Sequence, residues 1–132
     1  MIEWTKEFET GFPLLDAQHR KLFDMIAEMT VFLEAPAVDD GKIQEFVASL
    51  EKYAREHFEC EERCMDQTGC LAREINLEAH RIFLDGVVRF KADFLGRGEK
   101  REFVAILQAS LNAWLRNHIL RVDSALRASK RT

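Results

Sequence analysis

The side chains with the clearest capacity for chemistry are the histidines. The chain has four of them, and each lies on the apolar stripe of a different segment: His19, His57, His80 and His118. A single histidine on an apolar face is more often a hydrogen-bonded core residue than a ligand. Four imidazoles in one core each leave a ring nitrogen in need of a partner, and a metal can serve all of them together. The pattern therefore indicates a metal site in the interior.

Acidic residues on the second segment sharpen this interpretation. Glu61 follows His57 by four residues, so both side chains project from the same face of a helix. A buried carboxylate without a partner is costly, and a metal ion is the partner that the histidines predict. A solvated charge run explains Glu59 and can extend to Glu62, but it does not explain Glu61, one turn from His57. Glu61 is therefore a candidate ligand.

A further carboxylate, Asp123, follows His118 by five residues. Five residues rotate an ideal helix by about 140°, so spacing alone favours a solvated acid near a helix end. Mixed imidazole and carboxylate donors suit iron, manganese or zinc, whereas calcium and magnesium prefer oxygen donors. Six such donors exceed the need of one tetrahedral zinc ion. Two metal ions bridged by Glu61 and Asp123 explain the number of donors better.

Four amphipathic helices are expected to position these side chains. Apolar residues spaced by three and four predict helices over about 16–34, 41–65, 71–95 and 101–120. The breaks "APAVDDG", "DQTGC" and "GRGEK" are short, and short connections favour antiparallel neighbours. The fold class is thus all-α, an up-down-up-down four-helix bundle that forms one domain over 1–132. Residues 1–15 form an arm, and its Trp4, Phe8 and Phe12 are expected to pack on the bundle.

Composition excludes several classes of partner. The formal net charge of −4 offers no basic surface for a phosphate backbone, so nucleic-acid binding is not expected. No signal peptide and no apolar segment long enough to span a membrane are present, so we expect a cytoplasmic protein without membrane contact. Cys60, Cys64 and Cys70 are an odd number, which favours reduced thiols over a disulfide framework. The sequence identifies no protein partner.

Several longer motifs resemble the hemerythrin family, and most closely the bacterial hemerythrins. They are Trp4, "DAQHRKLF" at 16–23, "HFECEERCM" at 57–65, "HRIF" at 80–83 and "LNAWLRNHILRVD" at 111–123. The resemblance covers nearly the whole chain. It implies a non-heme centre of two iron ions, with carboxylate and oxo or hydroxo bridges, that binds dioxygen reversibly.

The resemblance also assigns a role to each candidate ligand. His19 and His57 would serve the iron ion with an open position for dioxygen. His80 and His118 would serve the other iron ion. Glu61 and Asp123 would bridge the two, and the five-residue step from His118 to Asp123 is the spacing that the family itself has. No residue is expected to be catalytic in the enzymatic sense.

One position departs from the family pattern. The family carries a third histidine four residues before the equivalent of His80, and this chain has Asn76 there. Its amide oxygen could bind the metal, a water could take the vacant place, or the second metal could be held loosely. Asn76 could equally be a polar core residue hydrogen-bonded to water. A thiolate from Cys60 or Cys64 is a further alternative, although free cysteine commonly behaves as a small hydrophobe.

Three functions follow from these residues. The first is a non-enzymatic protein that stores, delivers or scavenges dioxygen. The second, motivated by Asn76, is an altered di-iron site with oxidase, peroxidase or nitric-oxide-related reactivity. The third is a metal-depleted bundle retained for interaction with other proteins.

Overall fold

The protein consists of helices and short connections. The computed structural model describes residues 4–96 and 100–130, and for five residues near the end of the last helix, Asp123 among them, it describes the backbone alone. The elements are the 3-10 helices η1 (Lys6–Phe8) and η2 (Phe94–Gly96) and the α-helices α1 (Pro13–Glu34), α2 (Asp40–Thr68), α3 (Arg73–Asp93) and α4 (Lys100–Lys130). The described residues contain no strand.

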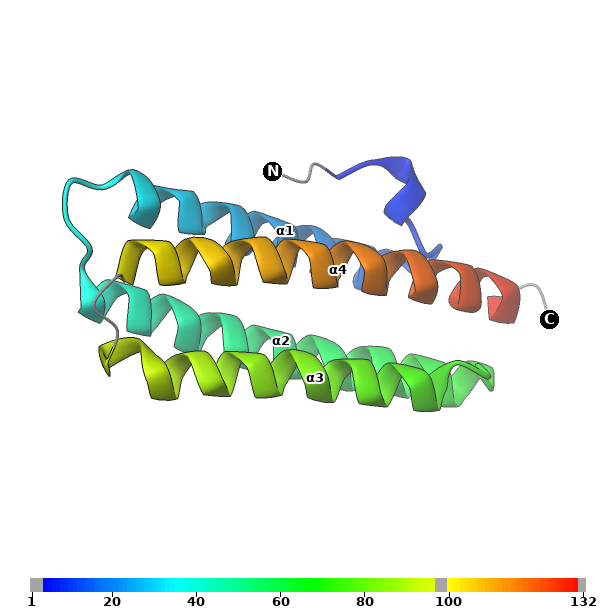
Figure 1. Ribbon diagram of the computed structural model, residues 1–132. Coiled ribbons are helices and arrows are strands. Elements are labelled where there is room, and N and C mark those ends of the chain that lie inside the picture. The colour runs from blue at the N-terminus through cyan, green and yellow to red at the C-terminus, as the bar shows by residue number, and fades with distance from the viewer. Residues whose placement is uncertain (1–3, 97–99, 131–132) are drawn as a thin grey trace.

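The four α-helices form a bundle in which consecutive helices run in opposite directions (Figure 1). α1 packs most extensively on α4, and α2 packs most extensively on α3. The all-α, up-down-up-down prediction is therefore confirmed. Within the described residues, no helix combines the length and the apolar character needed to cross a membrane.

The start of α1 and the end of α2 lie outside the predicted ranges. α1 begins at Pro13, a residue suited to the first helical position because its missing N–H would be unpaired there anyway. The carboxylate of Asp16 accepts hydrogen bonds from the backbone N–H and the hydroxyl of Thr10, at 2.7 and 2.8 Å. α2 continues to Thr68 and ends at Gly69, which adopts the left-handed conformation with a φ of 65°.

The fourth helix is longer than predicted. It reaches Lys130, whereas the prediction ended it at about residue 120. Val122 and Leu126 continue the apolar stripe beyond His118 at intervals of four residues, and both are buried. They belong to a small apolar cluster with Leu15, Met65 and Cys70. This cluster gives the last turns of α4 a buried face, which explains the added length.

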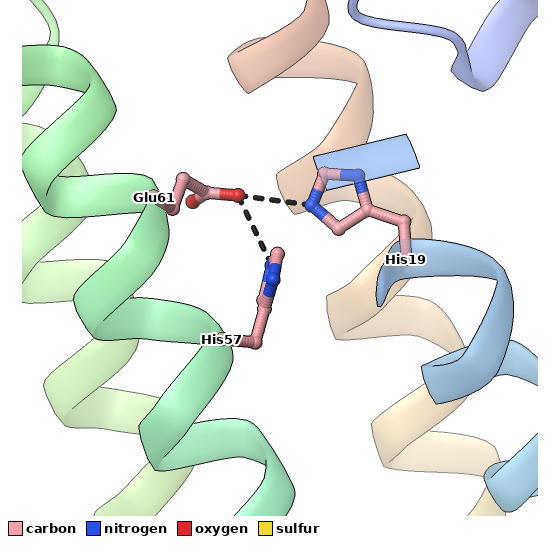
Figure 2. A group of neighbouring side chains, drawn as sticks. All are labelled: His19, His57 and Glu61. Atoms are coloured by element: carbon pink, nitrogen blue, oxygen red, sulfur yellow. Dashed lines mark hydrogen bonds and ion pairs between the residues drawn. The ribbon is translucent and has the colours of Figure 1, made fainter. Parts of the chain in front are cut away.

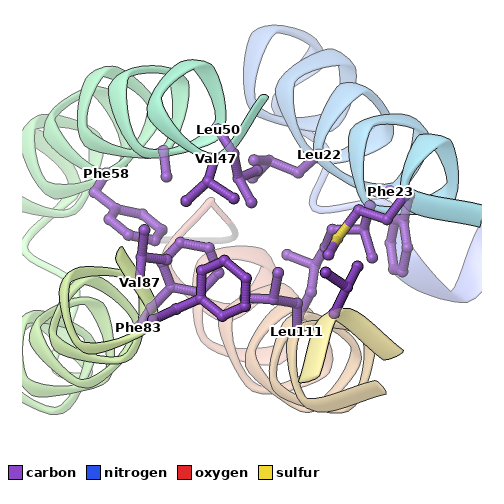
Figure 3. Packing of buried hydrophobic residues seen from close by; sticks show 14 of the residues in the cluster. Leu22, Phe23, Val47, Leu50, Phe58, Phe83, Val87 and Leu111 are labelled. Carbon is purple, nitrogen blue, oxygen red and sulfur yellow. The ribbon is translucent and has the colours of Figure 1, made fainter. Parts of the chain in front are cut away.

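A large apolar cluster from all four helices fills the rest of the bundle. Figure 3 shows Leu22, Phe23, Val47, Leu50, Phe58, Phe83, Val87 and Leu111 packed together in it. Each buried leucine or phenylalanine contributes about 1.5–3 kcal/mol to the free energy of unfolding. On α2, Phe58 belongs to the large cluster and Met65 to the small one, and Glu61 lies between them. The two clusters thus enclose a polar layer.

The N-terminal arm packs on the first helix. The ring centroids of Trp4 and Phe8 lie 5.6 Å apart, and those of Phe8 and Phe23 lie 5.3 Å apart. Trp4 contacts Phe23 edge-on at 5.9 Å. These aromatic contacts fix the arm beside α1, four residues from His19 along that helix.

Candidate metal centre

Glu61 is the centre of the polar layer and is completely buried. Its Oε2 lies 2.9 Å from Nε2 of His19 and 3.2 Å from Nε2 of His57 (Figure 2). Its Oε1 lies 2.9 Å from Nε2 of His80 and 3.0 Å from Nε2 of His118. Each carboxylate oxygen therefore faces its own pair of imidazoles, and each of the four helices supplies one imidazole.

These contacts define two groups of donors that share one carboxylate. His19, His57 and Glu61 form the first group, and Glu61, His80 and His118 form the second. Within each group the donor atoms lie within 4.8 Å of one another, and every member is buried. Five of the six predicted site residues are thus brought together. Asp123 lies in α4, but its side chain is outside the described part of the chain, so its bridging role stays a prediction.

The hydrogen bond of His80 Nδ1 determines the tautomer of the ring, and therefore whether the Nε2 atom near Glu61 carries a hydrogen or a lone pair. Nδ1 of His80 lies 2.7 Å from Oε2 of Glu62. A carboxylate only accepts, so Nδ1 carries the hydrogen. In the neutral ring, Nε2 then presents its lone pair to Oε1 of Glu61 at 2.9 Å and to Nε2 of His118 at 3.3 Å. A lone pair facing a carboxylate is repulsive, and a bound cation would make the same arrangement attractive.

His57 is oriented in the same way. Its Nδ1 donates to the amide oxygen of Gln18 at 2.7 Å, which leaves the lone pair on Nε2. This Nε2 forms no hydrogen bond with any described residue, although it is buried and close to Glu61. A metal-binding histidine usually donates its other ring N–H to such a partner, which fixes the ring and its tautomer. The orphaned nitrogen is therefore an observation that fits a metal ion.

Aromatic rings hold the second pair of imidazoles in place. Phe58 stacks on His80 with ring centroids 3.9 Å apart, and Trp114 stacks on His118 at 4.5 Å. Phe83 contacts both supporting rings, with centroid distances of 5.4 Å to Phe58 and 4.7 Å to Trp114. The stacking of Phe58 on His80 and of Trp114 on His118 limits rotation of the two imidazoles and keeps their surroundings apolar.

Burial determines the charges at the centre. It lowers the pKa of the His57 imidazole, and it lowers the pKa of His118 to about 4, although the Glu61 carboxylate opposes both shifts. Burial alone would raise the pKa of Glu61, but hydrogen bonds from His118 and His19 hold it well below its usual range. The result is an anionic Glu61 carboxylate beside the neutral imidazoles of His57 and His118, and these are the protonation states that a metal ion requires.

The lowered pKa of His118 predicts how acid affects the metal-free protein. The unfolded chain binds a proton on this imidazole below about pH 6.5 and the native protein only below about pH 4, so acid favours unfolding. In the presence of a chelator, the free energy of unfolding should rise as the pH increases from about 4 to about 6.5, by roughly 3 kcal/mol from His118 alone. Urea unfolding across this range measures the effect. His118→Gln should reduce the slope by one proton, and an unchanged slope would contradict the assignment.

Asn76 contacts the same oxygen of Glu61, Oε1, as the imidazoles of His80 and His118. Its Nδ2 donates to Oε1 of Glu61 at 2.8 Å and contacts the sulfur of Met65 at 3.3 Å. Its Oδ1 is buried and has no hydrogen-bond partner among the described residues. The amide therefore supports Glu61 through its nitrogen and leaves its oxygen available.

The cysteines lie apart from both donor groups. All three are free thiols, with Cys60 and Cys64 half-buried and Cys70 buried. Among the described residues no cysteine belongs to either group of potential metal donors. Burial raises the pKa of the Cys64 thiol, and the charge of Glu61 adds to this shift. The thiol is thus the favoured form, and the structure gives the thiolate alternative no support.

Two functional contacts were missed by the sequence reasoning. The sequence gives no signal for Gln18, and for Glu62 it suggests no role beyond the solvated charge run. Both are neighbours of a predicted ligand in the chain, Gln18 of His19 and Glu62 of Glu61, but each serves a histidine on another helix. Helical spacing reports which face a residue is on, whereas these pairs depend on how two helices are rotated against each other.

Comparison with known proteins identifies relatives along almost the whole chain. The family model described as "Hemerythrin HHE cation binding domain" matches residues 10–127. A bacteriohemerythrin of Clostridium acetobutylicum is 27% identical over 125 residues, which cover 93% of this chain and 96% of the relative. A bacteriohemerythrin of Stenotrophomonas maltophilia (strain R551-3) is 25% identical over 125 residues, covering 95% and 78%. Another, of Pseudomonas aeruginosa (strain LESB58), is 25% identical over 123 residues, covering 93% and 77%.

Proposed function

Because the chain belongs to the hemerythrin family and is a non-heme iron protein, we propose that it binds dioxygen reversibly at a centre of two iron ions. His19 and His57 would hold one ion, His80 and His118 the other, and Glu61 would bridge them. Asp123 would be a second bridge. The observation that carries the proposal is Glu61 itself, because each of its oxygens faces two imidazole Nε2 atoms within 3.2 Å.

The donor set suits iron in chemical terms. Imidazole and carboxylate together bind ferrous and ferric iron well. When bound, the ferrous pair would supply the two electrons that dioxygen takes up. The resemblance places dioxygen at the ion held by His19 and His57.

The protein's own part is to hold the ligands and to surround them with apolar side chains. Gln18 and Glu62 fix the rings of His57 and His80 through their Nδ1 hydrogens. Phe58 covers the ring of His80 with apolar surface, and Trp114 covers the ring of His118. Rigid, apolar surroundings limit the access of bulk solvent and of the protons that would drive irreversible oxidation.

We further propose that the protein is a carrier of dioxygen, for storage, delivery or scavenging, and not an enzyme. Among the described residues, the buried ionisable side chains other than Cys70 are the four histidines and Glu61. All five are assigned as ligands, and Glu62, at the edge of the site, is paired with His80. A centre whose buried ionisable groups all serve as ligands suits reversible binding better than turnover, which needs a group free to transfer protons.

An optical experiment tests this function. Protein loaded with iron and reduced without oxygen should develop a visible charge-transfer band in air and lose it when oxygen is removed, over repeated cycles. Zinc-loaded protein is the control, because zinc has no redox chemistry and should give no band. A fully iron-loaded sample without a reversible band would overturn the proposal. Rapid irreversible oxidation with turnover of added peroxide would favour the oxidase or peroxidase alternative.

A further inference from the structure

A small cavity lies beside the position where this chain departs from its family. It has a volume of about 20 Å³, and Met65, Asn76, Ala79, His118 and Val122 are among the residues that line it. A cavity needs about 10–15 Å³ of such volume to hold one water molecule. This one therefore has room for a single water and little more.

Asn76, one of the residues that line the cavity, carries a polar atom that lacks a partner among the described residues. Asn76 is 4% exposed, and its Oδ1 is buried without a hydrogen-bond partner among the described residues. An unsatisfied buried acceptor costs about 1–3 kcal/mol. Because Nδ2 of the same amide is held by Glu61 at 2.8 Å, the oxygen is fixed on the other side of the amide. A water in the cavity would donate a hydrogen to it and remove the cost.

The cavity also adjoins the second group of metal donors. Asn76 precedes His80 by one turn of α3, so the two side chains share a face of that helix. Asn76, His80 and His118 all contact the same oxygen of Glu61, Oε1, at 2.8, 2.9 and 3.0 Å. His118 lines the cavity as well. A molecule held by Asn76 would thus lie on the side of Glu61 that belongs to the second pair of imidazoles.

We propose that Asn76 anchors one exchangeable water molecule in this cavity, and that the water serves the metal ion held by His80 and His118 in place of the absent imidazole. The inference rests on the iron centre proposed above. Asn76 is a positioning residue in it: the amide nitrogen holds Glu61 and the amide oxygen orients the water. The ligand class is narrow, since the cavity admits one oxygen atom and Oδ1 requires that it carry a hydrogen.

The consequence is a second coordination position with an exchangeable ligand. It belongs to the ion held by His80 and His118, whereas the resemblance assigns dioxygen to the ion held by His19 and His57. An imidazole fixed in a helix does not exchange with solvent, whereas a single water does. The chain would differ from relatives with the additional histidine in having one labile ligand of this kind.

The first test needs no metal. A high-resolution crystal structure of the metal-free protein should show one water in the cavity within hydrogen-bond distance of Asn76 Oδ1. Asn76→Leu has a side chain of similar size without an acceptor, and its structure should lose that water while keeping the fold. An empty cavity in the unsubstituted protein would overturn the inference, as would a water that persists in N76L at full occupancy.

The second test addresses the metal ion. Pulsed electron paramagnetic resonance on the mixed-valent, iron-loaded protein in ¹⁷O-labelled water should show coupling to an exchangeable oxygen. Asn76→His is the matched control, because it supplies the imidazole and retains any bridging oxygen, so only the signal of the cavity water should be lost. Identical ¹⁷O signals in both proteins would contradict the inference, and direct ligation by the amide would be the remaining explanation.

Failure of this inference can be told apart from failure of the proposed function. The optical band with dioxygen is recorded on the same iron-loaded samples. A reversible band with no cavity water would reject the water and leave oxygen binding intact. A cavity water without a reversible band would reject oxygen binding alone. A protein that binds no iron would reject both.

Discussion

Replacing Glu61 with glutamine should abolish iron loading at both positions. The carboxylate is the one described side chain that belongs to both groups of donors, and each of its oxygens faces two imidazoles. Loss of a hydrogen-bond partner behind a ligand typically lowers metal affinity about 10- to 100-fold. Removing a ligand shared by two ions should therefore cost more than about 100-fold for each. Iron content per chain after reconstitution and desalting measures the effect.

The metal-free fold should survive this change. A glutamine amide can accept a hydrogen bond through its oxygen and donate one to the Nε2 lone pair of His57 or His80, which removes the repulsion described above. Glu59→Gln is the matched control, since it alters an exposed acid two residues away on the same helix and should load iron normally. Circular dichroism should show that both variants are folded. A Glu61→Gln protein that retains two iron ions would refute the central role of Glu61.

Iron should also stabilise the protein strongly against heat. Metal binds the assembled centre and not the unfolded chain, so free metal at about 1,000 times its dissociation constant adds about 4 kcal/mol to the free energy of unfolding. For a domain of this size, each kcal/mol raises the melting temperature by roughly 3–5 °C. The expected shift between chelated and iron-loaded protein is therefore on the order of 10–20 °C. Scanning calorimetry under anaerobic conditions measures it.

The same comparison in Glu61→Gln provides the control for this shift. Weak binding of iron to surface carboxylates would stabilise both proteins equally, whereas binding at the centre should leave the variant unchanged. Equal melting temperatures for the chelated and iron-loaded unsubstituted protein would mean that the four histidines form a hydrogen-bonded core and hold no metal.

Much of this arrangement was predictable because it depends on helical periodicity. Spacing of three and four residues predicted the helices and placed Glu61 on the face of His57, and the structure brings Glu61 together with all four histidines. Helix ends were less predictable, since they depend on local partners. The Pro13 start and the long end of α4 reflect the contacts of Asp16 and the buried Leu126.

What the sequence left open depends on contacts between helices. The Glu62–His80 and Gln18–His57 pairs arise from the rotation of neighbouring helices, on which periodicity is silent. Asn76 marks the departure from the family, but only the structure shows that its nitrogen supports Glu61 and that the residue lines a cavity with room for about one water. Asp123 rests on its spacing in the family and remains a prediction.

The position of iron relative to Glu61 tests the proposed centre most directly. A crystal structure of the iron-reconstituted protein, with anomalous scattering recorded at the iron absorption edge, locates each ion without reference to activity. Two anomalous peaks are expected, one between Glu61 Oε2 and the imidazoles of His19 and His57, and one between Oε1 and those of His80 and His118. A single peak, or peaks away from Glu61 in fully loaded protein, would contradict the two-iron centre.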